Sequence, residues 1–199
     1  RGNPDTLVLS PNITYDLMVH TIPPIEKKNI TIEKGKHNVI PVDAPQGYLK
    51  LELDGALSKY FPTCVVRKKG EMNTLNIQDF GKTDKYIVGK YDLEILTLPR
   101  IKLNDVEIQQ STTNTIKVPT SGNVYIVKGG NGYGSIFADD GKKMTWVCNL
   151  NTSLQNEIIY LQPGNYKMEF RYENAKQTTN TIERKFSVTS AVTTNVKLN

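Results

Sequence analysis

The stretch YDLMVHTIPPI at residues 15–25 recurs as YDLEILTLPRI at residues 91–101, 76 positions later and without a gap. The match continues downstream at this offset, so that ten of the 28 positions from Tyr15 to Val42 are identical to their counterparts. A fixed offset held over this length indicates an internal repeat rather than chance similarity. The chain is therefore predicted to be a tandem array of one unit of about 75 residues.

A third and more diverged copy ends the chain. Residues 166–170 match 91–95, and the strand pattern that follows recurs after about five extra residues at 177–181, which predicts a longer hairpin tip there. The front of the unit also repeats. We therefore expect residues 46–121 and 122–199 to be complete repeats, and residues 1–45 to be the back half of a truncated first repeat. The rest of that first repeat is expected upstream, or is replaced by strands from elsewhere in the fold.

Within each copy, side chains alternate between apolar and polar, which is the period of a strand with one buried face. Residues 15, 17, 19 and 21 share one face, and their counterparts in 91–97 and 166–172 stay apolar or amphipathic. Glycine-rich turn signals separate the runs, and no amphipathic helix is evident beyond a short turn near 55–60. The sequence predicts an all-β fold of tandem antiparallel β-sandwich repeats, of immunoglobulin-like or transthyretin-like type. Further strands are expected at 29–33, 37–42, 48–53, 63–67, 73–77, 104–108, 114–118, 123–128, 144–149, 157–161 and 181–188.

Composition describes an ordinary globular chain. Of the 199 residues, 38% are hydrophobic and 23% are charged, which argues against disorder. No apolar run approaches the roughly 18–20 residues that span a bilayer, so direct membrane insertion is not predicted. No signal peptide is visible, but the chain starts mid-pattern and therefore looks trimmed. The net charge of +5 is spread thinly, with no block longer than Arg67–Lys69, so nucleic-acid binding is not predicted.

No metal, cofactor or nucleophile site is evident. Cys64 and Cys148 occupy different positions in their repeats and are expected to be buried free thiols. No CxxC or HxxxH spacing occurs, and His20 and His37 are expected at the surface. The glycines of 129–134 are followed by no GK[ST] sequence, so we expect a hairpin or bulge there rather than a phosphate-binding loop.

Catalysis is not predicted either. The only acidic residue that two repeats share is Asp16, which corresponds to Asp92, and the third copy has Lys167 in its place. A glycosidase needs two carboxylates in one cleft, which sequence alone does not exclude. An enzyme would show a deep pocket with convergent acids or a histidine with a shifted pKa.

The third unit contains LQPGNYKMEF at residues 161–170, followed by strands that end at Val188 and Leu198. This pattern resembles PEGA-type or carboxypeptidase-regulatory-like β-sandwich domains. A Pro-Gly turn starts a strand whose Tyr166 and Phe170 face the core. The second unit has IVGKY at residues 87–91 and lacks the proline, so it departs from the strict pattern.

The whole chain also resembles the C-terminal repeat region of bacterial, Bacteroidetes-type von Willebrand factor A-domain proteins. The resemblance rests on DAPQGYL at residues 43–49, NTLNI at 73–77 and GKYDLEILTLPRI at 89–101. It implies an upstream metal-binding A domain and an extracytoplasmic location, in the periplasm or at the cell surface. The DxSxS metal motif of that domain is absent here, so no metal role is implied for these residues.

The leading hypothesis is a noncatalytic structural or protein-interaction module, a cell-envelope spacer or stalk beside an upstream ligand-binding domain. Its expected partners are another protein or that upstream domain. The alternative is a carbohydrate-binding module that stacks sugars on Tyr133 and Trp146, with Asp139 and Asp140 nearby for calcium-assisted binding. Burial of Trp146 would exclude this alternative.

Overall fold

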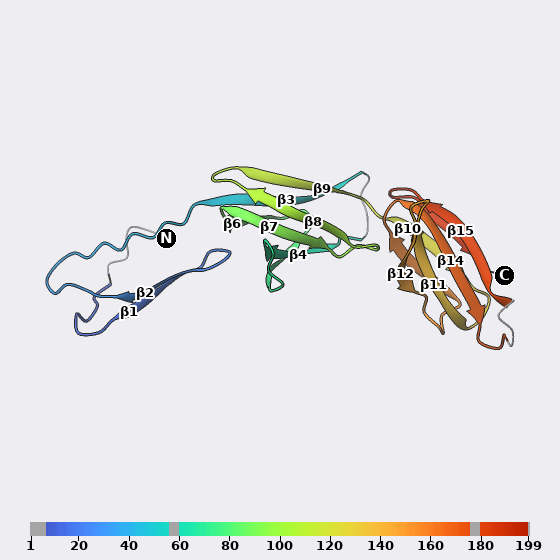
Figure 1. The fold of residues 1–199 in the computed structure, drawn as a ribbon, viewed down its shortest axis with the longest axis horizontal. Coiled ribbons are helices and arrows are strands. Elements are labelled where there is room, and N and C mark those ends of the chain that lie inside the picture. The colour runs from blue at the N-terminus through green and yellow to red at the C-terminus, as the bar shows by residue number, and fades with distance from the viewer. Residues whose placement is uncertain (1–6, 56–59, 176–179, 199) are drawn as a thin grey trace.

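The computed structural model describes residues 7–55, 60–175 and 180–198. Sixteen strands run through them, no α-helix is present in these ranges, and the predicted all-β class is confirmed. Within the same ranges no helix is long and apolar enough to cross a membrane. The predicted turn near 55–60 and the extra residues near 177–181 fall mostly outside the described residues. Figure 1 shows a hairpin and two groups of strands that follow one another along the long axis.

The middle group is a sandwich of a three-stranded and a four-stranded sheet, here called the middle sandwich. All its strand pairs are antiparallel except β3 with β9, which run parallel. The smaller sheet has the order β6 (Thr83–Ile87), β3 (Gln46–Asp54), β9 (Thr113–Pro119). The larger sheet has the order β5 (Thr74–Asp79), β4 (Thr63–Lys68), β7 (Gly89–Ile95), β8 (Ile101–Ile108).

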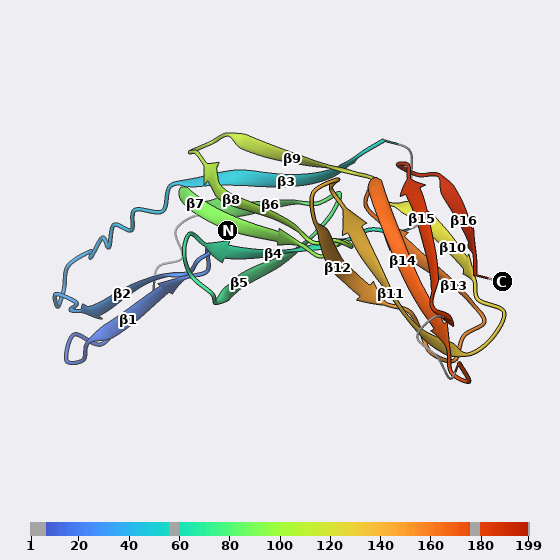
Figure 2. The ribbon, with the colours of Figure 1, turned by 45° about the vertical axis from the view of Figure 1, so that its right-hand side comes forward.

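The last group, the C-terminal sandwich, repeats this strand order, including the parallel pair (Figure 2). Its smaller sheet is β13 (Asn156–Leu161), β10 (Gly122–Val127), β16 (Thr193–Lys197). Its larger sheet is β12 (Met144–Asn149), β11 (Gly132–Asp139), β14 (Gly164–Tyr172), β15 (Ile182–Val188).

Each sandwich has its own apolar core between its two sheets, and burying that core is what stabilises the fold. The predicted inner face of the repeated strand is confirmed, because all six of its residues are at most 3% exposed in β7 and β14. These residues are Tyr91, Leu93, Ile95, Tyr166, Met168 and Phe170.

The first repeat is represented by the hairpin of β1 (Tyr15–Val19) and β2 (Ile25–Ile30), which corresponds to β7–β8. The predicted strand at 37–42 is wrong, and the strand predicted at 29–33 lies earlier, in β2. In both sandwiches the equivalent of 37–42 is β9 or β16, which pairs with the first strand of its own unit. The described part of the first repeat has no such strand, so this segment has no ladder to join.

Two strands, β6 and β11, were not predicted. In β11 the core-facing positions 132 and 134 are glycines, which removes the apolar alternation from the sequence. Added Cβ atoms there would overlap the carbonyl oxygens of the neighbouring β14 and the Phe170 ring, so side chains are excluded at these positions. Residues 132–134 of the glycine run therefore begin β11, and residues 129–131 form the loop that joins β10 to β11 in the other sheet, so the predicted hairpin is not found there.

Candidate functional site

The outer face of β11 and β12 carries the aromatic residues singled out from the sequence. Tyr133 is 62% exposed and Trp146 is 56% exposed, so the burial that would exclude sugar stacking is not observed. Phe137 lies opposite Trp146 in the strand register and points to the same face. Sequence reasoning missed Phe137, which shares the parity of Tyr133 and becomes visible only once β11 is known to be a strand.

Polar side chains fill the space between these aromatics. The Asn149 Oδ1 atom accepts hydrogen bonds from Trp146 Nε1 at 3.0 Å and from Ser135 Oγ at 2.8 Å. Tyr133 and Phe137 are four residues apart on one strand, a span of about 13 Å. We call Tyr133, Ser135, Phe137, Trp146 and Asn149 the aromatic row. It combines aromatic stacking surfaces with hydrogen-bonding groups.

Asp139 and Asp140 lie at the β11–β12 turn, beyond the row. Asp139 Oδ1 accepts the Gly141 N–H at 2.9 Å, and Asp140 Oδ1 accepts those of Lys142 and Lys143 at 2.8 and 2.7 Å. These backbone donors hold the pKa of the Asp140 carboxyl below its usual value. In the described ranges no group of three or more histidine, cysteine, aspartate or glutamate residues is arranged to hold a metal ion.

The middle sandwich has no aromatic row. By register, Arg67 occupies the position of Phe137, and Thr74 that of Trp146. Arg67 instead pairs with Glu94 at 2.9 Å, and Arg100 pairs with the other carboxylate oxygen at 2.9 Å. Arg100 and Arg67 lower the pKa of Glu94. The outer faces of the two sandwiches therefore differ in chemistry although their frames are the same.

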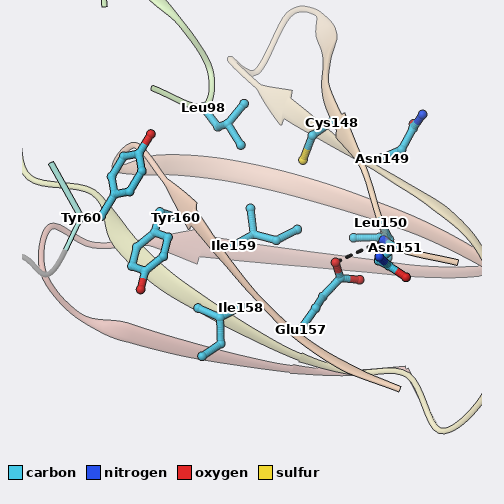
Figure 3. Close-up of a pocket in the computed structure, with 10 residues that line it drawn as sticks. All are labelled: Tyr60, Leu98, Cys148, Asn149, Leu150, Asn151, Glu157, Ile158, Ile159 and Tyr160. Atoms are coloured by element: carbon cyan, nitrogen blue, oxygen red, sulfur yellow. Dashed lines mark hydrogen bonds between the residues drawn. The ribbon is translucent and has the colours of Figure 1, made fainter. Parts of the chain in front are cut away.

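A cleft of about 450 Å³ lies where the two sandwiches meet (Figure 3). Tyr60 and Leu98 of the middle part face β12, β13 and the loop after β12, and the Tyr60 ring stacks on Tyr160 with centroids 5.0 Å apart. Cys148 lines the cleft and is half-buried, which corrects the prediction that both thiols are buried, whereas Cys64 is buried. Burial raises the pKa of Cys148 to about 11, so its thiol stays protonated and weakly nucleophilic near neutral pH.

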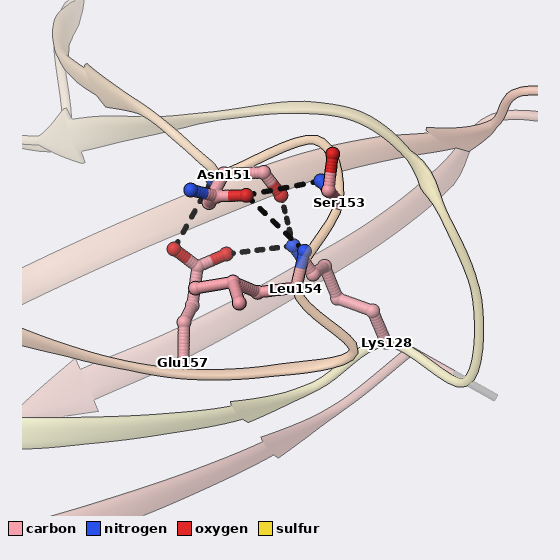
Figure 4. Close-up of polar contacts among 5 residues, drawn as sticks. All are labelled: Lys128, Asn151, Ser153, Leu154 and Glu157. Carbon is pink, nitrogen blue, oxygen red and sulfur yellow. Dashed lines mark hydrogen bonds and ion pairs between the residues drawn. The ribbon is translucent and has the colours of Figure 1, made fainter.

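Next to this cleft is a buried ion pair that sequence reasoning missed (Figure 4). The Lys128 side chain is fully buried, and its Nζ lies 2.9 Å from Glu157 Oε1 and also donates to the Asn151 carbonyl. Glu157 Oε2 accepts the Asn151 N–H at 3.2 Å, and Asn151 Oδ1 accepts the N–H groups of Ser153 and Leu154. The Lys128 ammonium and both Glu157 carboxylate oxygens thus have partners within the cluster, as buried charges require.

The acid shared by two repeats has a structural role. Asp16 Oδ1 accepts the Asn29 N–H at 3.0 Å, and Asp92 Oδ1 accepts the Asp105 N–H at 3.0 Å. Asn29 and Asp105 both have positive φ, 58° and 59°, at irregularities in the two hairpins. The β14–β15 register runs without a shift, which explains why lysine can replace the acid there.

The N–H groups of Gly70 and Asp105 hold the pKa of the Asp92 carboxyl below its usual value, that of Gly70 contributing most. His20 and His37 are exposed, as predicted.

Comparisons with known proteins identify no family. No protein-family model and no curated protein matches the chain. Six chains among solved structures align with it, and the three described here do so at low identity. The Bacillus anthracis TIE protein is 14% identical with a TM-score of 0.31, over 90% of this chain and 38% of that one. The minor pilin GBS52 of Streptococcus agalactiae is 9% identical with a TM-score of 0.35, over 76% of this chain and 94% of that one.

The third is the pilus adhesin SpaC of Lactobacillus rhamnosus GG, 10% identical with a TM-score of 0.28, over 73% of this chain and 26% of that one. The chain thus spans well under half of the TIE and SpaC chains. The resemblances to PEGA-type domains and to von Willebrand factor A-associated repeats gain no support from these matches and stay predictions.

Proposed function

We propose that this chain is a noncatalytic structural module, a spacer or protein-interaction stalk of the cell envelope. In this proposal residues 46–121 and 122–199 are β-sandwich repeats, and residues 1–45 are the back half of another. Its partners are a protein or an upstream ligand-binding domain of the same polypeptide.

The observation that carries the proposal is the direct packing of the two sandwiches against each other, end to end. Leu98 from the β7–β8 hairpin packs against the core of the C-terminal sandwich, and its carbonyl accepts the Gln162 N–H at 2.7 Å. The stacked rings of Tyr60 and Tyr160 join the same interface. A junction with an apolar contact, a hydrogen bond and a ring stack restrains relative motion, which a spacer needs in order to hold its ends apart.

Nuclear spin relaxation of the full chain tests the proposed rigid spacer. We expect amides in β3–β9 and amides in β10–β16 to report one shared rotational correlation time, because the junction makes the two sandwiches tumble together. Small-angle X-ray scattering should give an elongated particle of matching length. Two separate correlation times would show independently moving domains and would overturn the spacer proposal.

The aromatic row favours a second candidate function, carbohydrate binding. Two large aromatics are more than half exposed on one sheet face, with the Asn149 amide and the Ser135 hydroxyl between them. Sugar rings stack on such faces while their hydroxyls bond to neighbouring polar groups. The candidate site comprises Tyr133 and Trp146, with Asp139 and Asp140 at the adjoining turn.

Trp146 is the only tryptophan, so its fluorescence reports directly on the row. If the row binds sugars, oligosaccharides selected on a glycan array should change that fluorescence. Replacing Trp146 with threonine, the residue at the equivalent position of the middle sandwich, should weaken array binding by roughly tenfold or more. Thr145→Ala is the matched control on the neighbouring residue. Array binding that is the same in the Trp146→Thr variant would exclude this site.

A further inference from the structure

The junction between the two sandwiches has a counterpart at the other end of the middle sandwich. The tip of the β1–β2 hairpin has the sequence Thr21-Ile22-Pro23, and the tip of β7–β8 has Thr97-Leu98-Pro99, 76 residues later. Figure 1 shows each hairpin pointing its tip at the group of strands that follows it. The two tips thus occupy equivalent places in successive units.

Both tips are closed by the same internal hydrogen bonds. Thr21 Oγ1 donates to the Pro23 carbonyl at 2.6 Å, and Thr97 Oγ1 donates to the Pro99 carbonyl at 2.7 Å. Each threonine N–H also bonds back to its strand, to Val19 at 2.8 Å and to Ile95 at 2.9 Å. This bracing fixes the tip, so the side chain between threonine and proline projects from a preset position.

In each case the projecting residue packs at an equivalent place in the sandwich that follows. Ile22 packs against the core of the middle sandwich, as Leu98 does against the core of the C-terminal sandwich. The Ile22 carbonyl accepts the Ile87 N–H at 2.7 Å, which matches the bond from Gln162 to Leu98 in length and position. Ile87 is the last residue of β6 and Gln162 directly follows β13, and the pairing of these strands with β3 and β10 makes the two positions equivalent.

Ile87 and Gln162, which bind the tips through their N–H groups, are also fixed through their carbonyl groups. Tyr91 Oη donates to the Ile87 carbonyl at 2.6 Å, and Tyr166 Oη donates to the Gln162 carbonyl at 2.6 Å. The tyrosine that starts the repeated sequence thus holds the residue whose N–H binds the tip. Its recurrence in the repeat therefore has a reason beyond filling the core.

We infer that the Thr-Ile/Leu-Pro tip is a plug by which each unit of this repeat recognises the next one. Its partner is the end of a following sandwich, where the N–H of a residue whose carbonyl accepts a tyrosine hydroxyl lies beside the apolar core. This inference deepens the proposed spacer function and rests on it, because it names the surface that sets the spacing and orientation of successive units.

The requirements for an apolar tip residue and for a receiving N–H also identify positions at which a plug cannot dock. In the third unit the tip positions hold Tyr172, Glu173 and Asn174, and Glu173 is exposed. A carboxylate at the plug position would be desolvated on entering an apolar core, so residues 172–174 cannot dock in the same way. On the receiving side, Pro11 lies 76 residues before Ile87 and has no N–H to donate. Among the described residues, plug docking is therefore expected at the two internal junctions.

Full-length chains carrying Leu98→Asp and Leu98→Ile test the plug. The isoleucine variant copies the first tip and should behave as the parent chain does. The aspartate variant should speed hydrogen exchange of the Gln162 amide by roughly tenfold or more, because its acceptor leaves. It should also give the two sandwiches separate correlation times. Protected core amides at Val124 and Ile126 would show that the C-terminal sandwich is still folded.

Ile22→Asp provides a second variant at the first junction, read through the Ile87 amide, should Leu98→Asp unfold the C-terminal sandwich. If the parent chain tumbles as one body, and the aspartate variant also tumbles as one body and keeps the Gln162 amide protected, the plug is overturned. The spacer proposal would stand in that case. A parent chain whose sandwiches already move independently would overturn the spacer proposal itself.

Discussion

Replacing Glu157 with alanine is expected to lower the free energy of unfolding of the C-terminal sandwich by about 3–5 kcal/mol. The Lys128 side chain is fully buried, and Glu157 is the carboxylate that neutralises it at 2.9 Å. Without Glu157 a buried ammonium keeps only the neutral Asn151 carbonyl as partner, and the Asn151 N–H loses its acceptor. Urea unfolding followed by Trp146 fluorescence measures the loss, because Trp146 lies in β12 of this sandwich.

The middle sandwich supplies the control for this prediction. By strand register, Leu53 occupies the position of Lys128 there, so this frame accepts an apolar side chain at that place. The double variant Lys128→Leu, Glu157→Gln should therefore lose less stability than Glu157→Ala alone, because it leaves no unpaired buried charge. A Glu157→Ala chain within about 1 kcal/mol of the parent would show that Lys128 reaches water, against its complete burial.

The ion pair also shows what the sequence could not reveal. Lys128 and Glu157 are 29 residues apart and have no counterpart in the other repeat, so neither periodicity nor self-similarity marks them. Their proximity follows only from the antiparallel pairing of β10 with β13. The repeated face of β7 and β14 was predictable because burial imposes period two on the residues themselves.

The candidate binding surface was predictable only in part, because the sequence shows residue types but not which strands pair. Tyr133 and Trp146 were identified from their residue types. Phe137 joins them through its cross-strand pairing with Trp146, which the sequence did not reveal because the glycines of β11 remove the apolar alternation of the strand. The Thr-Ile/Leu-Pro tips were visible as identities within the repeat. Their role was not, because each tip acts on a peptide of the next unit, 64 or 65 residues away in sequence.

Large effects of a single added methyl group are expected at Gly47 and Gly122, the equivalent glycines near the start of β3 and β10. We expect Gly47→Ala and Gly122→Ala each to destabilise its sandwich by about 3 kcal/mol, the upper end for overpacking. A Cβ at Gly47 would overlap the Gln109 carbonyl oxygen, and one at Gly122 would overlap that of Thr189. Because backbone cannot rotate away as a side chain does, the turn itself would have to move.

The reason for these contacts lies in the topology. In both sandwiches the turn before the last strand crosses this glycine, so that β9 or β16 can run parallel to the first strand. In the C-terminal sandwich the turn is held there by the Asn123 N–H, which donates to the Val192 carbonyl at 3.0 Å. Gly89→Ala is the matched control, since a Cβ there meets only Tyr91 at 3.9 Å, and should change stability by less than about 1 kcal/mol. Thermal unfolding of the three variants separates the outcomes. Equal melting temperatures for Gly122→Ala and Gly89→Ala would mean that the crossing turn is loose, and that the parallel pair does not depend on close backbone approach.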